Sequence, residues 1–596
     1  MGAAPPEHPF RERVLRLVRS EQVILSLLAG LVGVAAAYGS IGFRELIALI
    51  QGAGFASMGG PLVAAVAQLP WWQIVAVPAL GGLAVGLLVR FFQAGARPHG
   101  VAEVMEASVL RGGRIALKQG VVAALGATIS IGSGASVGRE GPAVHIGASL
   151  ASWLGQRLKL SRSLSLTLLG CGVAAAVSAS FNAPIAGAFF ALEVVIGHYA
   201  LSAFAPVVIA SVAGTIVARV HLGDYPAFIL GELELVSFLE LPAFALLGVV
   251  SAGVAVVFMH GILFTQSAWQ RTVVPGWLRP AIGGAAVGAI ALVLPEILGV
   301  GYEATDRALH GALPLWLLIA LLGAKIAATS LSLGSGFVGG VFSPSLFTGA
   351  MTGGAFGLIA ASVLPELSSS QGVYAIAGMG AVAGAVLGAP ISTILIVFEL
   401  TGSYEITIVV MVAVAVAAMI TGQLGARSFF HLLLLRRGLD LVESREAGFL
   451  RETHVSDFMT RDFTSLAPDA GIAEVKRILS QDHDADIVVV GADGRLLGMV
   501  GFADIKDVTF EAGLDSLLNA KDLLRPGAET LVAEDVLATA EQKMEASNSD
   551  RLAVVADDES GRVIGIAHRD RALKAHSTAL QIAWRETSGD RRKRPR

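Results

Sequence analysis

The sequence predicts an all-α polytopic membrane domain made of two inverted-repeat halves, followed by a smaller α/β domain. Three observations support this fold class. The chain has 596 residues, of which 54% are hydrophobic and only 15% charged, whereas an ordinary soluble protein has about 25% charged residues. Its mean hydropathy is +0.69. Each of the two predicted bodies also contains an internal repeat of its own.

The chain begins with a basic amphipathic segment over residues 1–20, which contains Arg11, Arg13, Arg16 and Arg19. Positive charge before the first apolar run favours a cytoplasmic N-terminus. No small-residue cleavage motif follows a short apolar core, so we expect no signal peptide.

Residues 21–438 form the predicted membrane domain. No Asp, Glu, Lys or Arg occurs between residues 326 and 365, or between residues 163 and 192. A bilayer-spanning helix needs about 20 apolar residues, so such runs predict several membrane helices.

The membrane domain repeats itself. "GSGASVGREGP" (132–142) has a counterpart 202 residues later in "GSGFVGGVFSP" (334–344). "NAPIAGAFFALEV" (182–194) has one 206 residues later in "GAPISTILIVFEL" (388–400), and in both copies a proline precedes a glutamate by nine positions. Two matched blocks in the same order indicate duplicated halves, placed at about 21–222 and 236–438. Such halves commonly have inverted topology, with a binding site at the membrane midplane.

The glycine-rich loops favour an anion site. Each loop ends in a proline near the start of an apolar segment, as expected at a helix N-terminus. A helix start has unpaired N–H groups and about half a positive charge, and glycine lets a small ligand approach the backbone. A cation site would instead need carbonyl groups or clustered carboxylates, and we find no close acidic cluster in the spans.

Glu140 is the exceptional residue of these loops. A carboxylate at the bilayer centre costs about 2.5–3.5 kcal/mol. At a helix start that favours anions, the carboxylate can occupy the anion's own place, block the path when ionised, and leave when it is displaced or protonated. The alternative is that Glu140 pairs with Arg139 and only anchors the helix.

The soluble part contains a second repeat. A linker over 439–454 leads to two α/β copies at 455–508 and 519–576, and a basic tail over 577–596 is expected to be disordered and solvated. "IVVVGADGRLLGMV" and "LAVVADDESGRVIGIA" each predict a strand, a turn and a second strand. "VSDFMT" and "AKDLLR" precede the two copies at matching places.

These blocks resemble a known family. "GREGP" (138–142), "GGVFSP" (339–344) and "FNAPIAGAFFALE" (181–193) are similar to the signature blocks of the CLC chloride channels and transporters, and the soluble repeat resembles a pair of CBS domains. The resemblance implies a homodimer with one anion pathway per subunit and many tilted, partly spanning helices. It implies chloride or a similar small anion as the transported ligand, no required cofactor and no nucleic-acid partner. We expect a multi-pass protein of a bacterial-type inner or plasma membrane with both termini in the cytoplasm.

The resemblance also assigns residues. Glu140 falls on the family's gating glutamate, which is one of the anion-binding positions. The other positions expected to contact the anion, mainly through backbone amides, are Gly138, Arg139, Gly141, Val341 and Phe342. For Phe342 the alternative is simple core packing.

Three positions depart from the family pattern. In "PHGVAEV" (98–104), His99 replaces a serine whose hydroxyl coordinates the central anion, and in "SFFH" (428–431) Phe430 replaces a tyrosine. Proton-coupled exchangers have a second glutamate just after the position of Glu193, where this chain has Val194. Valine cannot hold a proton, so we predict passive, channel-like or proton-uncoupled conduction. The alternative is a proton-coupled antiporter in which another acid substitutes.

Histidine titrates near pH 6.5, so we also expect conduction to depend on cytoplasmic pH through His99, unless this residue is solvated or satisfied in the core. Glu103, Glu106 and Lys118 are expected to be solvated near a loop.

CBS pairs often bind adenine nucleotides through an aspartate that reaches the ribose. Asp504 keeps that position, but Gly501 and His568 replace the hydroxyl residues of the two copies. The pattern therefore favours a structural or dimer-stabilising role over nucleotide binding.

Other function classes fit the sequence less well. A CBS-regulated magnesium transporter would need acidic pore rings. We find no order of Ser, His and Asp, no His-rich metal motif and no P-loop, so no enzyme and no metal site are expected. The single cysteine, Cys171, excludes an internal disulfide.

Overall fold

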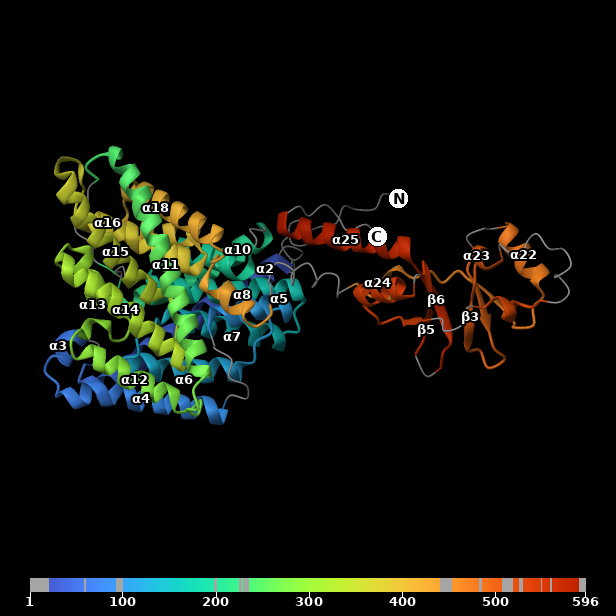
Figure 1. The fold of residues 1–596 in the computed structure, drawn as a ribbon, viewed down its shortest axis with the longest axis horizontal. Helices are drawn as coiled ribbons and strands as arrows, with labels where there is room; N and C mark the ends of the chain where they lie inside the picture. Colours follow the sequence, from blue (N-terminus) through green and yellow to red (C-terminus); the bar gives the residue numbers. More distant parts are fainter. Residues whose placement is uncertain are drawn as a thin grey trace, which may run out of the picture. The chain divides into compact units, whose positions relative to one another are not determined.

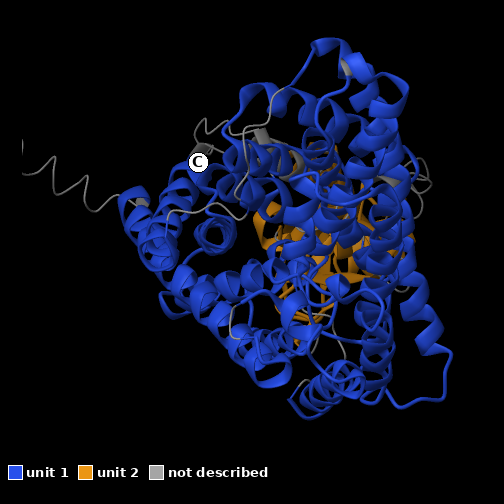
Figure 2. Cartoon of the chain, turned by 90° about the vertical axis from the view of Figure 1, so that its left-hand side faces the viewer, with its two compact units in different colours: residues 1–441 blue, residues 442–596 orange. Residues whose placement is uncertain are grey.

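The computed structural model describes residues 21–57, 60–92, 100–197, 201–223, 228, 235–439, 453–481, 485–505, 518–524, 529–547, 549–557 and 560–588. The chain divides into two compact units, residues 1–441 and 442–596 (Figure 2). The predicted N-terminal segment 1–20 and most of the linker 439–454 lie outside the described residues. The two units are described separately below.

The first unit is helical, as predicted (Figure 1). Eight of its described helices are long and apolar enough to cross a membrane. The elements of its first half are α2 (Glu21–Phe55), α3 (Leu62–Val66), α4 (Trp71–Phe92), α5 (Val101–Leu110), α6 (Leu117–Gly132), α7 (Glu140–Arg157), α8 (Arg162–Phe181), α9 (Pro184–Phe190), the π-helix η1 (Ala191–Ile196) and α10 (Leu201–Leu222).

The second half repeats this order. Its elements are η2 (Phe238–Glu240), α11 (Leu241–Gln270), α12 (Arg279–Ala291), η3 (Pro295–Ile297), α13 (Tyr302–Leu309), α14 (Leu315–Ser335), α15 (Phe342–Val363), η4 (Pro365–Leu367), α16 (Gln371–Leu387), α17 (Pro390–Thr401), α18 (Tyr404–Gln423) and α19 (Phe429–Leu435). Both halves mix long helices with short ones, and glycine and proline interrupt the apolar segments at matching places.

The two halves pack through reciprocal contacts. Where α4 crosses α12, a side chain on Gly82 would collide with the carbonyl oxygen of Pro280, and one on Gly284 would collide with that of Pro78. Both members of each matched pair lie 202 residues apart. Only glycine permits this close approach, so the crossing lies on an internal two-fold relation between the halves.

The glycine loops also meet each other. Gly138 N donates a hydrogen bond to Gly340 O at 2.7 Å, and Gly340 N donates to Gly138 O at 2.8 Å. This exchange joins the loop before α7 to the loop before α15, so the two helix starts converge on one place.

Two glutamates cap helices in the opposite half. Ile185 N and Ala186 N at the start of α9 donate to Glu399 at 2.9 and 2.7 Å. Ile391 N and Ser392 N at the start of α17 donate to Glu193 at 3.1 and 2.8 Å. A carboxylate at a helix N-terminus satisfies orphan N–H groups and complements the helix dipole. The nine-residue spacing from proline to glutamate therefore has a structural cause.

The second unit consists of two similar three-stranded sheets. Its elements are α21 (Val455–Phe458), β1 (Thr464–Leu466), α22 (Ile472–Gln481), β2 (Ile487–Val490), β3 (Leu496–Val500), α23 (Phe502–Ile505), η5 (Ala520–Leu523), β4 (Thr530–Val532), α24 (Leu537–Ala546), β5 (Arg551–Val555), β6 (Val563–His568) and α25 (Arg569–Ser588). In each sheet the first strand is parallel to the second, and the second and third strands form the antiparallel hairpin predicted from the sequence.

The leading segments of the two copies are exchanged. Val455 and Phe458 of α21 pack into the core of the second copy, and Thr460 bridges to Ile566. Ala520 of η5 packs in the core of the first copy. Each copy is therefore completed by residues that precede the other one.

The predicted tail differs from the structure in its first part. Helix α25 continues through Ser588, so residues 577–588 are helical rather than disordered. Residues 589–596 lie outside the described residues.

Candidate functional site

The site is built where the starts of α7 and α15 meet. Glu140 is the first residue of α7, and only 1% of its surface is exposed. The paired glycine loops place it beside the first turn of α15, where Ser343 follows Phe342. A buried carboxylate thus stands at two converging helix N-termini.

Two hydroxyl groups hold the Glu140 carboxylate. Tyr302 Oη donates to Oε1 at 2.6 Å, and Ser343 Oγ donates to Oε2 at 2.5 Å. Arg139 Nε is 3.8 Å from Oε1, which is beyond ordinary hydrogen-bond distance. The Arg139 guanidinium instead lies 5.0 Å from the centre of the Tyr302 ring. The close partners of Glu140 are therefore hydroxyls from the second half.

Glu140 lines a cavity of about 550 Å³. The cavity brings together five of the predicted site residues, and these are Glu140, Gly141, Val341, Phe342 and Phe430. Arg90 and Arg279 also line it and are its only other charged lining residues in the described part of the chain. The cavity wall is thus largely apolar and rich in glycine, with two arginines and one acid, Glu140.

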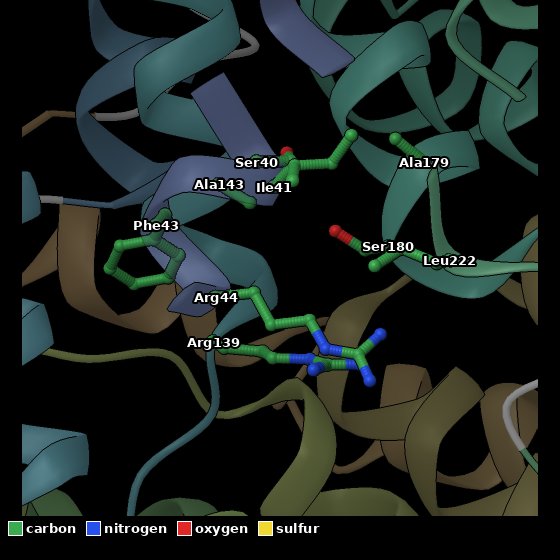
Figure 3. Close-up of a pocket in the computed structure, with 9 residues that line it drawn as sticks. All are labelled: Ser40, Ile41, Phe43, Arg44, Arg139, Ala143, Ala179, Ser180 and Leu222. Atoms are coloured by element: carbon green, nitrogen blue, oxygen red, sulfur yellow. The ribbon is translucent and has the colours of Figure 1, made fainter. Parts of the chain in front are cut away.

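The remaining predicted residues of the loops lie elsewhere. Gly138 takes part in the pairing with Gly340. Arg139 lines a separate small pocket (Figure 3). His99 lies outside the described residues, although its neighbour Gly100 lines the large cavity.

Phe342 packs in the core and also lines the cavity. Its ring packs against Phe181 and Phe190, with centroid distances of 4.9 and 6.2 Å. The same residue begins α15 and lines the cavity. The ring therefore anchors the helix start whose backbone faces the cavity.

The position of the missing proton acceptor is apolar. Val194 is 5% exposed and belongs to the main hydrophobic core. Its neighbour Glu193 is engaged by Ile391 N, Ser392 N and Ser392 Oγ at the start of α17.

The expectation that Glu103 and Glu106 are solvated is wrong. Glu103 is 2% exposed, and its Oε2 lies 3.3 Å from His145 Nε2. Glu106 is 8% exposed and pairs with Arg111 and Arg437 at 3.0 and 3.3 Å. Both are on α5, which packs against α7 and α19. Basic partners, two of which (His145 and Arg437) come from other helices, make this burial tolerable. Lys118 is exposed, as expected.

Sequence reasoning missed Tyr302, Ser343 and Lys325. Lys325 is fully buried, and its Nζ donates to Ile297 O at 2.9 Å and to Gly299 O at 3.0 Å. It thereby fixes the turn that leads into Tyr302. A lysine directly before a forty-residue charge-free run was the available signal, but its carbonyl partners cannot be read from sequence.

In the second unit, Asp504 accepts a hydrogen bond from Gly501 N at 2.9 Å. The carboxylate that would reach a ribose therefore binds its own loop. Among the described residues, no group of three His, Cys, Asp or Glu side chains is placed to hold a metal ion.

Comparisons with known proteins agree with this architecture. The family described as voltage gated chloride channel matches residues 81–422, and the CBS domain family matches residues 455–510 and 520–577. A putative chloride channel protein ClcB-like of Ralstonia nicotianae is 36% identical over 415 residues, which are 69% of this chain and 96% of that protein.

Solved structures show the same fold. A slow cyanobacterial Cl⁻/H⁺ antiporter superposes with a TM-score of 0.62 at 22% identity, over 70% of this chain and 98% of the other. A eukaryotic CLC transporter superposes with a TM-score of 0.61 at 20% identity, over 94% of this chain and 98% of the other.

The fold and the site therefore define an integral membrane transport protein with a C-terminal pair of CBS domains. The chain belongs to the CLC family of voltage-gated chloride channels and transporters, whose members transport chloride and are not enzymes.

Proposed function

We propose that the protein is a passive anion pathway, channel-like or at least uncoupled from protons, in which Glu140 is the gate. In this proposal the ionised carboxylate occupies the anion's place between the starts of α7 and α15. An anion arriving through the large cavity, or a proton, displaces it, and the path opens.

The geometry around Glu140 supports a gate rather than an anchor. Its two oxygens accept from Tyr302 and Ser343, not from Arg139 at 3.8 Å. Hydroxyl groups can exchange a carboxylate for a chloride ion, because both are hydrogen-bond acceptors with negative charge. Glu140 also lines a cavity of about 550 Å³, which gives an anion a way to reach the carboxylate.

The absence of proton coupling rests chiefly on Val194. This side chain lies in the hydrophobic core, and the acid beside it, Glu193, caps α17. Glu399 caps α9 in the same way. Glu240 is held by Ser369 and Tyr374. These three acids are engaged by structural partners, which opposes their use as a proton stepping stone.

Purified protein in liposomes provides the test. A chloride gradient should drive chloride flux without uphill movement of protons. Stoichiometric uphill proton pumping against a chloride gradient would refute the uncoupled mechanism and establish the antiporter alternative. Large chloride currents in a planar bilayer would identify a channel.

We further propose that the protein is a homodimer in an inner or plasma membrane, with both termini in the cytoplasm. The CBS pair is proposed to stabilise the assembly rather than to bind adenine nucleotide, because Asp504 is engaged with Gly501. Calorimetry of the full-length protein with ATP and AMP tests this, and saturable heat with either nucleotide would contradict it.

A further inference from the structure

Lys325 is a buried lysine that takes no direct part in the proposed gate. It lies in α14 and is fully buried. Its hydrogen-bond partners in the described part of the chain are Ile297 O at 2.9 Å and Gly299 O at 3.0 Å, neither of which carries a full negative charge. An ammonium group that is removed from water without a carboxylate partner destabilises a fold. An apolar side chain of similar length would fill this space at less cost, so packing alone does not explain the lysine.

The turn that Lys325 holds is also bonded to the gate loop. Gly299 N donates a hydrogen bond to Gly134 O at 3.1 Å. Gly134 belongs to the glycine loop that leads into α7 and Glu140. The position of this turn in the second half is therefore shared with the loop that places the carboxylate in the first half.

The same turn sets the start of α13, where Tyr302 holds the carboxylate. Gly301 has a φ of +85°, which glycine adopts without strain. A Cβ atom on Gly301 would lie 2.7 Å from the Phe347 ring and 3.1 Å from Lys325 Nζ, so the chain is packed directly against both groups. Because Tyr302 is the next residue, these contacts fix the backbone from which its hydroxyl reaches Glu140 at 2.6 Å.

Phe347 connects the lysine to the second hydroxyl that holds the carboxylate. Lys325 Nζ lies 4.9 Å from the centre of the Phe347 ring, within the range of a cation–π contact. Phe347 follows Ser343 by four residues on α15, so the two side chains share one face of that helix. Lys325 therefore borders both holding groups, one through the turn and the other through this ring.

The same face of α14 carries further contacts to the gate loop. Thr329 and Ser332 follow Lys325 by four and seven residues, which places all three on one face of the helix. Thr329 Oγ1 lies 3.2 Å from Ser136 Oγ, and Ser332 Oγ accepts a hydrogen bond from Ser136 N at 3.1 Å. Ser136 belongs to the loop that leads into α7. This face of α14 thus supports the gate loop along its length.

We propose that Lys325 is a positioning residue of the gate. Its two hydrogen bonds keep the hydroxyl groups of Tyr302 and Ser343 where they stabilise the ionised Glu140 carboxylate and hold the path closed. Lys325 does not line the large cavity, so it acts through these residues and not on the anion. The inference rests on the proposed function in that Glu140 is the gate.

The pH profile of chloride flux in liposomes separates positioning from general structural support. Lys325→Met keeps an unbranched side chain but removes the donor. The loosened carboxylate should raise flux at neutral pH about three- to tenfold, by up to the value of one hydrogen bond to a charged group. Flux at acidic pH, where the carboxylate is protonated, should stay near that of the wild type. The ratio of acidic to neutral flux should therefore fall by the same factor.

A purely structural role predicts a different result. Lys325→Met would then lower the amount of folded protein, scale the two fluxes equally and leave their ratio unchanged, which would overturn the proposal. The ionisable groups that face Glu140, Arg139 at 3.8 Å and Tyr302, are present in the variant. Glu296 of η3, which packs against α14, lies 3.8 Å from its partner Arg307 and is also retained.

Two further variants test whether the charged donor is responsible. Lys325→Arg keeps a cationic donor and should return the flux ratio toward that of the wild type. A ratio as low as that of Lys325→Met would overturn the role of the donor. Ser330→Ala is the matched control, because Ser330 is a buried residue of α14 whose Oγ faces Gly261 of α11. It should leave the ratio unchanged, and a changed ratio would show that any loss of packing on α14 alters the gate.

The structure of the full-length Lys325→Met protein provides a test that does not need transport. The hydroxyl of Tyr302 or of Ser343 is expected to move beyond hydrogen-bond distance of the Glu140 carboxylate. Two unchanged hydrogen bonds would overturn the proposal. Failure of the proposed function is recognised separately, because Glu140→Ala would then leave chloride flux unchanged whatever the position of the hydroxyls.

Discussion

The two halves of the membrane unit share a scaffold but not a chemistry. In the first half, the glycine loop leads into α7 with Glu140 at its start, and in the second half the matching position, 202 residues on, is Phe342. The backbone exchange between Gly138 and Gly340 is nearly symmetric, at 2.7 and 2.8 Å. The first half therefore provides the acid, and the second half provides an aromatic anchor and the hydroxyls of Tyr302 and Ser343 that hold the acid.

The two halves also differ in the charged side chains that they bury. The first half buries Glu103 against His145, and the positions 202 residues later are Thr305 and Phe347. The second half instead buries Lys325 over the Phe347 ring at 4.9 Å, and its counterpart in the first half is Ala123. The two halves therefore share their backbone contacts, such as the crossing of α4 and α12, but they differ in their buried charged residues.

The largest effect is expected when Glu140, the acid that distinguishes the first half from the second, is removed. Glu140→Ala should raise chloride flux about tenfold or more and abolish its increase at low pH, because no carboxylate competes with the anion. The magnitude follows from hydrogen bonds to a charged group, which are worth about 1.5–3 kcal/mol. Chloride efflux from liposomes across a pH series measures it.

Phe342→Leu is the control from the other half, since it keeps the apolar anchor. It should retain the pH dependence of the wild type. Unchanged flux in Glu140→Ala would remove the gate from the mechanism.

The second prediction concerns the hydroxyls that the second half provides. Tyr302→Phe should loosen the Glu140 carboxylate and raise flux by up to about tenfold, because it removes one hydrogen bond to a charged group, worth about 1.5 kcal/mol at the lower end of the range. Ser343→Ala should act in the same direction. Efflux rates of the two single variants and of the double variant form a cycle that measures their coupling.

In a Glu140→Ala background, Tyr302→Phe should no longer raise flux, and any remaining effect should come only from the lost contact between the hydroxyl and the anion. An equal increase in both backgrounds would show that Tyr302 does not act through the gate.

The third prediction concerns the two reciprocal helix caps, which are made by Glu193 and Glu399. Glu193→Gln and Glu399→Gln should each lower stability by about 1 kcal/mol, comparable to the loss of a helix cap, and by similar amounts because the two caps are reciprocal. Thermal unfolding of the detergent-solubilised protein, followed by fluorescence, compares the variants.

Glu405→Gln is a suitable reference, because Glu405 is exposed near the start of α18. A strong loss in only one of the two cap variants would contradict their structural equivalence.

The smallest expected effect is at Phe430, another residue that lines the large cavity. Phe430→Tyr adds a hydroxyl to a lining residue and should change relative chloride and nitrate permeation by no more than about threefold, the value of a weak exposed hydrogen bond. Reversal potentials in mixed-anion solutions measure this. Phe429→Tyr is the control, because Phe429 also lines the cavity. Comparing the two variants indicates whether the change in permeation depends on which residue carries the hydroxyl.

Local patterns in the sequence predicted much of this architecture. The charge-free runs predicted the membrane helices, and the Gly-Pro blocks predicted the duplicated halves and the meeting of Glu140, Val341 and Phe342 around one space. These features depend on composition and short-range spacing, which are visible along the chain.

Pairings between distant segments were not predictable in this way. The burial of Glu103 depends on His145, and the hold on Glu140 depends on Tyr302, 162 residues away. The exchange of α21 and η5 between the CBS copies likewise arises from packing across the repeat. Proline-to-glutamate spacing was recognised, but the capping role of the glutamates required the three-dimensional structure.

The reciprocal carboxylates have a consequence for biogenesis. The backbone amide of Ile185 donates to Glu399, which lies 214 residues later in the chain. At about 5–20 residues per second, the ribosome needs about 10–40 s to translate the residues between them. Until the ribosome has made the second half, the start of α9 lacks the partner that a lipid environment cannot replace. A truncated first half should therefore remain immature in the membrane and be a substrate for quality-control proteases.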